Sequence, residues 1–380
     1  MANLYNEILH ERVSYEKSYP SVTPIFQTSG FNADSNDFYA RKSTPNSTEL
    51  ENILKKMEGS EYALSVSTGM SAIFLCLNLL HQGNRVLICS KIYGCSYKLF
   101  KIYCQQHAIE LDILDITNKE EYEKIKNKIY DMCFFETPTN PFLDTVDIYE
   151  ISIMCKARNS NCIIIVDNTW ATPIYQKPLN FGADIVVYSG TKYFSGHSDV
   201  MCGFITTNNN MLFEKILEWR FYCGLILTPF HAWLVRRSLQ TFQIRMEQQK
   251  KTTIEIKNKL KDLKFIRRIY YPNIDGKQLT NYGGIIFIEV EDDIVKKYEK
   301  ILKKLRLFGN GTGMACVTSM IAQPYTGSHA SLSVEEKLKM GISPNLLRLC
   351  FGLEEPDALY NDLLQAFTFN DTEVFYDNIK

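Results

Sequence analysis

The stretch that decides the fold is VDNTWATPIYQKPLNFGADIVVYSGTKYFSGHSD, residues 166–199. It contains the end of one apolar run, Cys162–Asp167, and the whole of a second, Ala183–Tyr188. Both runs are short, rich in β-branched residues and free of polar alternation, which is typical of strands buried on both faces of a parallel sheet. Polar residues such as Ser189 and Lys192 follow directly. The stretch therefore predicts buried parallel strands whose polar ends meet at one edge of the sheet.

The same alternation of apolar runs and helical patterns continues on both sides of this stretch. Strands are predicted at residues 62–67, 85–90, 132–136, 162–167 and 183–188. Helices are predicted between them, at residues 48–58, 71–80, 97–107 and 148–158. Strands that alternate with helices predict an α/β fold built on a doubly wound, mainly parallel sheet.

The composition and the periodicity of apolar residues change along the sequence and divide the chain into three parts. Residues 1–47 are polar and poorly periodic, which predicts an N-terminal arm that reaches a neighbouring subunit. Residues 48–245 carry the elements above and form a large domain. A charge-rich helix is predicted at 245–268, followed by strands at 284–290 and 346–350 and a helix at 357–367. These elements predict a smaller C-terminal α/β domain over residues 246–380.

The composition narrows the class of protein. The chain has 380 residues, 45% of them hydrophobic, and a formal net charge of −1, so it can build packed cores and has no bulk charge that would attract nucleic acid. It has no run of about 20 apolar residues, so no membrane span is expected, and no signal peptide is expected at its start. The eleven cysteines include no CxxC pair and no zinc spacing, which predicts reduced thiols, no metal site and a cytoplasmic protein.

Two of the predicted strand ends suit a phosphate group. The turn Ser67–Ser71 is made of small residues and leads into a helix, whose N-terminal N–H groups and dipole attract a phosphate. The hydroxyls of Ser189 and Thr191 add donors at a second strand end. These residues predict a site for a phosphorylated ligand.

Three further side chains indicate the rest of the ligand. Asp167 ends a buried strand, where a lone carboxylate needs a cationic partner. Lys192 follows the next strand, and the aromatic ring of Tyr93 follows an earlier one. Each is ordinary on its own, because an aspartate there is usually a cap and a lysine is usually on the surface. Together they supply what pyridoxal phosphate (PLP) requires: a Schiff-base lysine, an acid for the ring nitrogen, a phosphate cup and an aromatic stack.

The motifs also resemble one known family. The matching segments are FYARKSTPNSTELE (38–51), STGMSAI (67–73), YGCSYKLF (93–100), ETPTNP (136–141), the stretch 166–199 and ISPNLLRLCFGLEEPDAL (342–359). They resemble the Cys/Met metabolism, or transsulfuration, family of PLP-dependent enzymes, which includes cystathionine γ-synthase, cystathionine γ-lyase and methionine γ-lyase. The resemblance spans nearly the whole chain. It implies the PLP-dependent transferase fold of type I, with residues 48–245 as the PLP-binding domain.

The resemblance implies a role for each cofactor residue. Lys192 would carry PLP as a Schiff base and shuttle protons, and Tyr93 would stack on the ring and assist that transfer. Asp167 would keep the ring nitrogen protonated, and Asn140 would contact the phenolic oxygen of the ring. The phosphate would be bound by Gly69, Met70, Ser189 and Thr191 of one subunit and by Tyr39 and Arg41 of its neighbour.

The resemblance also implies how substrate binds and how the chain assembles. Arg348 would bind the α-carboxylate of an amino-acid substrate, because a guanidinium fork matches a carboxylate. A site completed by a neighbour's arm implies a homo-oligomer, and the family suggests a dimer of dimers. No nucleic-acid or membrane partner is expected.

The sequence departs from the family pattern in two places. The family's Asn-Pro-Thr is Thr44-Pro45-Asn46 here. Its Ser-Leu-Gly-Gly, whose serine lies close to the Schiff-base lysine, is Gly313-Met314-Ala315-Cys316. The hydroxyl that would steer the free lysine is therefore absent.

Two residues near the distal end of the substrate favour different reactions. Lys98 stands where the synthase branch has an arginine, and it could pair with an acyl or cystathionine carboxylate. Cys95 is instead what many methionine γ-lyases carry. We expect elimination or replacement at the γ- or β-carbon of a sulfur-containing or O-acylated homoserine-type amino acid, and Lys98 favours γ-replacement, as in cystathionine γ-synthase. The alternatives are a C–S lyase, such as methionine or cystathionine γ-lyase, and a non-catalytic PLP-binding relative, against which the retained cofactor residues argue.

Overall fold

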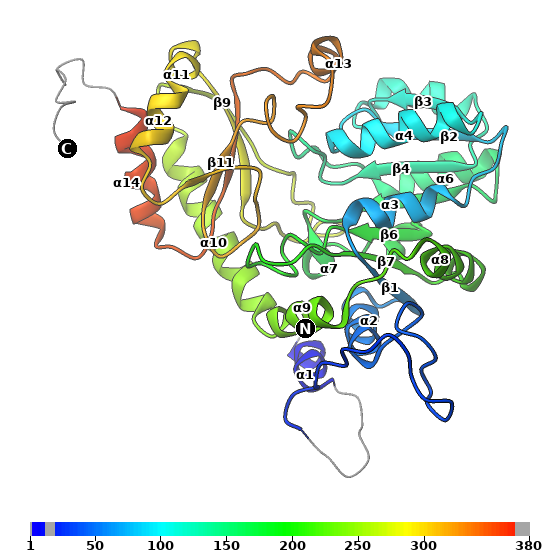
Figure 1. Cartoon of the computed structure of the whole chain (residues 1–380). Helices are drawn as coiled ribbons and strands as arrows, with labels where there is room; N and C mark the ends of the chain where they lie inside the picture. Colours follow the sequence, from blue (N-terminus) through cyan, green and yellow to red (C-terminus); the bar gives the residue numbers. More distant parts are fainter. Residues whose placement is uncertain (1, 12–19, 369–380) are drawn as a thin grey trace.

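The computed structural model describes residues 2–11 and 20–368. Its larger part is built on a seven-stranded sheet in the order β1-β7-β6-β5-β4-β2-β3 (Figure 1). The strands are β1 (Tyr62–Val66), β2 (Arg85–Cys89), β3 (Glu110–Leu114), β4 (Met132–Glu136), β5 (Ile163–Asp167), β6 (Ile185–Tyr188) and β7 (Gly203–Thr207). From β6 to β3 they run parallel, whereas β7 is antiparallel to both β6 and β1. The predicted doubly wound, mainly parallel sheet is confirmed.

The helices of the large domain connect these strands. They are α2 (Pro45–Glu58), α3 (Gly69–Leu77), α4 (Gly94–Gln106), α5 (Tyr122–Lys126), α6 (Ile148–Arg158), α7 (Thr172–Tyr175), α8 (Asn210–Cys223) and α9 (Pro229–Leu239). Local chemistry sets their ends. The side chain of Thr44 caps α2, Pro45 occupies its first turn, and Gly59 ends it with φ 78°.

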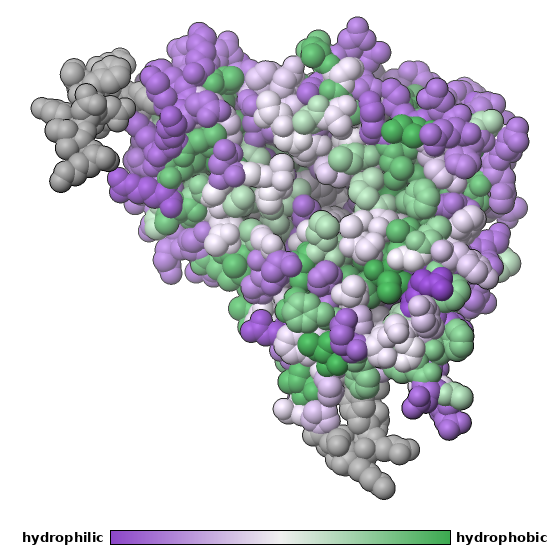
Figure 2. Space-filling model, viewed as in Figure 1, coloured by the Kyte–Doolittle hydropathy of each residue, from purple (hydrophilic) through white to green (hydrophobic). Residues whose placement is uncertain are grey.

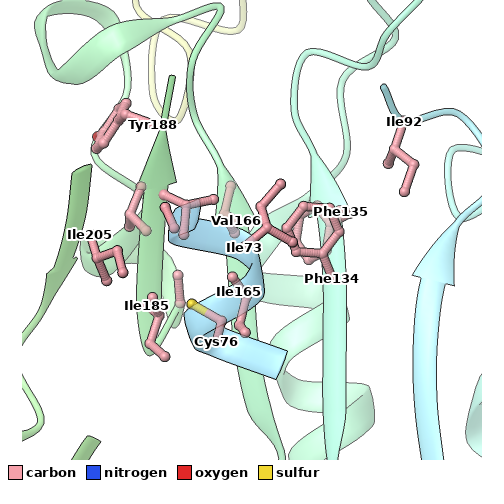
Figure 3. Packing of buried hydrophobic residues seen from close by; sticks show 14 of the residues in the cluster. Ile73, Cys76, Ile92, Phe134, Phe135, Ile165, Val166, Ile185, Tyr188 and Ile205 are labelled. Carbon is pink, nitrogen blue, oxygen red and sulfur yellow. The ribbon is translucent and has the colours of Figure 1, made fainter. Parts of the chain in front are cut away.

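The core of the large domain lies between the central strands and α3 (Figure 3). Phe134 and Phe135 are neighbours on β4, so their side chains face opposite sides of the sheet, yet both are fully buried. Ile73 and Cys76 of α3 pack near Val166 of β5. This burial on two faces explains why the strands are continuous apolar runs in the sequence.

The C-terminal part contains a second sheet of five strands, in the order β10-β11-β12-β9-β8. These are β8 (Ile266–Tyr270), β9 (Ile285–Val290), β10 (Gly309–Asn310), β11 (Met320–Ala322) and β12 (Leu346–Cys350). The helices are α10 (Phe242–Leu260), α11 (Asp292–Lys296), α12 (Tyr298–Lys304), α13 (Val334–Lys339) and α14 (Pro356–Phe367). Central strand β12 pairs antiparallel with both β9 and β11.

Helix α10 joins the two cores. Phe242 and Met246 pack in the core of the large domain, whereas Ile256 and Leu260 pack in the separate core of the C-terminal sheet. The predicted boundary at residues 245/246 therefore falls inside this helix. The helix predicted over 245–268 is too long, because α10 ends at Leu260 and β8 begins at Ile266. The basic run misled the prediction, since its apolar residues belong to two different elements.

Several other elements were not predicted from the sequence. Strand β3 (ELDIL) lies at the edge of the sheet and carries two acidic residues, and β7 (GFITT) begins with a glycine, so neither resembles a buried strand. Within the predicted arm, α1 (Ala2–His10) is helical and packs against α2 of its own chain. Residues 12–19 of the arm lie outside the described residues.

Three general features of the chain bear on its chemistry. No helix within residues 2–11 and 20–368 is long and apolar enough to cross a membrane. All eleven cysteines are free thiols. No group of three or more His, Cys, Asp or Glu in the described part of the chain could hold a metal ion.

Candidate active site

A cavity of about 350 Å³ lies at the carboxyl ends of the central strands, where parallel strands present their polar residues. On this face of the molecule the surface is hollowed between the two domains (Figure 2). The cavity is lined by Thr68, Gly69, Met70, Ile73, Tyr93, Ser96, Glu136, Asn140, Asp167, Thr169, Trp170, Ser189, Thr191, Lys192, Met201 and Met314. All the predicted cofactor residues except Tyr39 and Arg41 are among them.

Lys192 lies in the turn that follows β6. Its main-chain N–H donates to the carbonyl of Ser189 at 3.2 Å, which fixes the turn, and its side chain lines the cavity. Burial lowers the pKa of its amine, and the charge of Arg348 lowers it further. A lysine with a lowered pKa is more often the neutral nucleophile that attacks an aldehyde.

Asp167 ends β5 and faces the same cavity. One of its carboxylate oxygens accepts the N–H of Thr169 at 2.9 Å. Burial raises the pKa of the carboxyl to about 6, opposed by the hydrogen bonds from Thr169, and no cation of the described chain lowers it. A buried carboxylate without a cation is costly. A protonated ring nitrogen would supply the missing charge.

The phosphate cup depends on a close approach of backbones. A Cβ at Gly69, the first residue of α3, would lie 3.0 Å from the Cα of Ser189. A Cβ at Gly203 would lie 2.2 Å from the carbonyl oxygen of Thr68. Glycine at both positions lets the N-terminus of α3 sit against the end of β6 and the start of β7, where its free N–H groups suit an anion.

Tyr93 and Asn140 follow two neighbouring strands, β2 and β4. Tyr93 is the residue before α4, and its main-chain N–H donates to Glu136 Oε1 at 2.7 Å. Burial raises the pKa of its phenol, aided by a contact with Cys95, so the hydroxyl stays protonated at neutral pH. Asn140 is buried in the loop after β4. An aromatic ring and an amide thus face one cavity, as a stacked and hydrogen-bonded ring requires.

Arg348 comes from β12 of the C-terminal sheet and is only 2% exposed. Its guanidinium donates to the carbonyls of Thr312 and Gly313, both at 3.0 Å, and contacts the sulfur of Met314 at 3.8 Å. Its Nε has no hydrogen-bond partner within the described chain. A buried cation with an orphaned donor is ready to bind a carboxylate.

Tyr39 and Arg41 do not line the cavity of their own chain. The guanidinium of Arg41 lies over the rings of Tyr39 and Phe221, at 5.3 Å and 4.3 Å from their centroids. It also donates to the carbonyl of Phe221 at 2.9 Å. Both side chains are held at the surface, away from the cavity that they were predicted to complete in a neighbour.

Lys98 is exposed on α4 and does not line the cavity. It lies near Glu336 of α13, whose carboxylate pairs with Lys101 at 2.6 Å and has its pKa lowered mainly by that hydrogen bond. The pair connects α4 to the C-terminal domain. The role of Lys98 in substrate binding stays a prediction.

Sequence reasoning missed several residues that line the cavity. Thr169 accepts the main-chain N–H of Ser189 at 2.8 Å and so ties the ends of β5 and β6 together. Trp170 follows it and is 3% exposed. Glu136 ends β4, and the signal that could have found it is the one that found Asp167: a carboxylate at the end of a buried strand.

The departure at residues 313–316 has a visible consequence. Met314 lines the cavity where the family pattern has a leucine, and the carbonyl of Gly313 binds Arg348. Ala315 adopts φ 62°, a conformation that favours the glycine of the family pattern. The loop thus keeps a backbone conformation that suits the family pattern, but it lacks the hydroxyl of the family's serine.

The residues present fit PLP joined to an amino acid. Arg348 does not line this cavity, but its charge lowers the pKa of Lys192, which does. Asp167, a carboxylate without a cation, and the glycine-dependent cup suit the ring nitrogen and the phosphate. Lys192 lies among them.

Comparison with known proteins agrees with this geometry. The family model described as "Cys/Met metabolism PLP-dependent enzyme" matches residues 7–368. The chain is 33% identical over 380 residues to a cystathionine beta-lyase of Lactococcus lactis subsp. cremoris, covering 96% of this chain and 99% of that one. It is 33% identical over 366 residues to an L-methionine gamma-lyase of Fusobacterium nucleatum subsp. polymorphum, covering 90% and 92%.

Two solved structures have the same fold as this chain. Cystathionine gamma synthase from Xanthomonas oryzae pv. oryzae, in complex with aminoacrylate and cysteine, superposes with a TM-score of 0.90 at 29% identity, covering 96% of this chain and 97% of that one. Cystathionine gamma-lyase from Lactobacillus plantarum, complexed with L-serine, gives a TM-score of 0.89 at 27% identity, covering 96% and 98%. The chain belongs to the Cys/Met metabolism family of PLP-dependent enzymes.

Proposed function

We propose that this enzyme removes or replaces the sulfur or acyloxy substituent on the γ- or β-carbon of an amino acid. The observation that carries the proposal is Arg348, a buried guanidinium with an orphaned Nε whose charge reaches Lys192. An arginine that binds a carboxylate, close to the lysine that carries PLP, selects an α-amino acid as the substrate. The relatives named above act at this kind of bond.

Each of the chain's own site residues has a separate role in the proposed reaction. PLP would supply an electron sink when bound, which makes the proton on the substrate's α-carbon acidic. Arg348 fixes the α-carboxylate and so the orientation of the bond to be broken. Lys192, with its lowered amine pKa, takes the α-proton and returns it elsewhere on the substrate. Tyr93, which lines the same cavity, stacks on the ring and assists this proton transfer.

Two outcomes of the same chemistry are compatible with this site. In γ-replacement, a thiol adds where an acyloxy group has left, and Lys98 favours this outcome through the substrate's distal carboxylate. In C–S lysis, the thiol leaves by elimination and no group takes its place, and water then hydrolyses the remaining unsaturated amine, so the products are a thiol, ammonia and a 2-oxo acid. The names of the lyase relatives favour the second outcome.

One assay separates these outcomes. The purified enzyme is incubated with methionine, cystathionine, cysteine, O-acetylhomoserine and O-succinylhomoserine, with and without added cysteine. A lyase forms 2-oxo acid from the sulfur amino acids without added thiol. A synthase forms a thioether from the O-acyl homoserine and cysteine. No turnover of any of them by PLP-loaded enzyme would contradict the proposed function.

Lys98→Ala tests the distal site. If Lys98 pairs with a distal carboxylate, the change should raise KM for cystathionine and O-succinylhomoserine about five-fold, since a partly exposed ion pair contributes about 1 kcal/mol. Methionine and O-acetylhomoserine carry no distal charge, so their KM should stay the same. Lys101→Ala is the matched control, because that lysine is bound to Glu336. Equal effects on charged and uncharged substrates would remove Lys98 from the site.

We also propose that the enzyme is a cytoplasmic dimer of dimers. Its eleven free cysteines suit a reducing compartment. Exposed large apolar side chains gather in the arm and on α8 and α9, in Phe38, Tyr39, Met211, Trp219, Tyr222 and Phe230. Hydrophobic residues are prominent on the lower half of the face in Figure 2. Such surfaces suit association between copies of the chain.

Subunit mixing tests whether Arg41 serves a neighbour. A Lys192→Ala chain and an Arg41→Ala chain should each be nearly inactive alone. After exchange, a hybrid dimer has one site with both residues intact, so random mixing should restore about a quarter of the wild-type sites. Activity is measured after exchange has been verified by mass spectrometry. No gain over the separate variants would place Arg41 outside the partner's site.

A further inference from the structure

Glu136 is a second buried carboxyl group in the cavity. It ends β4, is 2% exposed and lines the cavity together with Asp167. The two residues are direct register partners on adjacent parallel strands. Paired residues of neighbouring strands lie about 5 Å apart and point to the same face of the sheet. Two carboxyl groups therefore lie side by side beneath the predicted position of the cofactor ring.

Glu136 makes one well-defined hydrogen bond. Its Oε1 accepts the main-chain N–H of Tyr93 at 2.7 Å. That N–H lies at the start of α4, where no helical carbonyl can accept it. Glu136 thus connects the end of β4 to the residue whose ring is expected to stack on the cofactor. If it were removed, the N–H of Tyr93 would lose its acceptor.

The pair cannot carry two charges. Glu136 is faced by Asp167 from β5, by Tyr93 from the start of α4 and by Trp170 from the loop after β5, and no cation of the described chain is among these groups. Two adjacent buried carboxylates cannot both ionise. Each carboxyl group accepts a main-chain N–H, Glu136 from Tyr93 and Asp167 from Thr169, so hydrogen bonding does not decide between them. Asp167 is the less buried, and it is the group expected to meet the positive ring nitrogen. The proton therefore belongs on Glu136.

We propose that Glu136 is a positioning residue that works as a neutral carboxylic acid. It holds Tyr93 over the ring through the main-chain N–H, and by keeping its proton it leaves the single negative charge of the pair on Asp167. The first role needs only an acceptor oxygen. The second needs the absence of a charge. A glutamine at this position satisfies both.

Two variants separate this proposal from a merely structural role. Glu136→Gln keeps shape, neutrality and the acceptor, so its affinity for PLP and the visible circular dichroism of bound PLP should match those of the wild type. Glu136→Ala leaves the N–H of Tyr93 without an acceptor, so PLP should bind about ten-fold more weakly and the dichroism should change. Asp362→Asn is the matched control. Asp362 is a buried acid that accepts the N–H groups of Arg306 and Leu307 in the C-terminal domain, far from the cavity.

The opposite results overturn the proposal. If Glu136→Gln is as damaged as Glu136→Ala, the site needs a charge on Glu136. If Glu136→Ala binds PLP with unchanged affinity and dichroism, Glu136 does not position Tyr93. Should the alanine variant fail to fold, infrared difference spectra of the wild type and Glu136→Gln at neutral pH decide. They should show a protonated carboxyl band only in the wild type, and the lack of that band contradicts a neutral Glu136.

Discussion

Replacing Lys192 by alanine should abolish covalent attachment of PLP and reduce turnover by several orders of magnitude. The change removes the only amine that lines the cavity in the described structure, and with it both the Schiff base and the group that moves the α-proton. Borohydride reduction followed by mass spectrometry should find a pyridoxyl group on Lys192 of the wild type and none on the variant.

The matched control is Lys126→Ala. Lys126 is an exposed lysine on α5 that pairs with Glu123, so its loss should change neither labelling nor turnover. The fold of the Lys192 variant is checked by comparing its far-UV circular dichroism spectrum in the PLP-free form with that of the PLP-free wild type, and the two spectra should match. A Lys192→Ala protein that retained covalent PLP and full activity would contradict the proposed mechanism.

Asp167→Asn should reduce turnover about a hundred-fold or more, since removing one partner of a buried ion pair typically costs 3–5 kcal/mol. Asparagine keeps the shape and can still accept the N–H of Thr169, but it cannot stabilise a positive ring nitrogen by charge. PLP should still be attached to Lys192, because the lysine and the phosphate cup are unchanged. The measurement is kcat for the best substrate of the panel, together with the PLP content of the variant.

Attachment without turnover is the distinctive outcome for Asp167. It separates loss of the electron sink from loss of the cofactor, which the Lys192 variant cannot do. Near-normal kcat in Asp167→Asn would remove the role assigned to this carboxylate. Loss of PLP together with a lower unfolding temperature would instead make its role structural.

The parts of the fold that follow from local burial were predictable from the sequence. The predicted bounds of β4, α6 and β12 agree with the structure, because each is a compact apolar or amphipathic run with a clear end. The edge strand β3, with its alternating charged residues, and the partly exposed β8, with two adjacent arginines, were not predictable, since such sequences fit a strand only once a neighbouring strand is known. The bounds of α10 depend on packing in two different cores, and a local sequence pattern carries no information about which core each residue joins.

The candidate site was predictable where chemistry and position coincide. Lys192 follows a buried strand and Asp167 ends one. A charged side chain at a buried position needs a partner, so both could be recognised as candidate site residues from the sequence. Glu136 has the same signature, because it too is the last residue of a predicted buried strand. Its meaning depends on the register that places it beside Asp167, and register is a property of the sheet rather than of one strand.

The origin of the two substrate contacts has a consequence for selectivity. Lys192 follows a strand of the large sheet, and Arg348 extends from the C-terminal sheet, one face of which packs in the same core as the large sheet. On the proposed roles, a bound amino acid spans the junction, with its amine at one sheet and its carboxylate at the other. The distance between the two sheets then selects substrates by the spacing of their amine and carboxylate groups. A decarboxylated amine reaches only one side, and an amino acid with an extra carbon between amine and carboxylate overshoots, so the fixed spacing between the two sheets sets which amino-acid backbones the enzyme accepts.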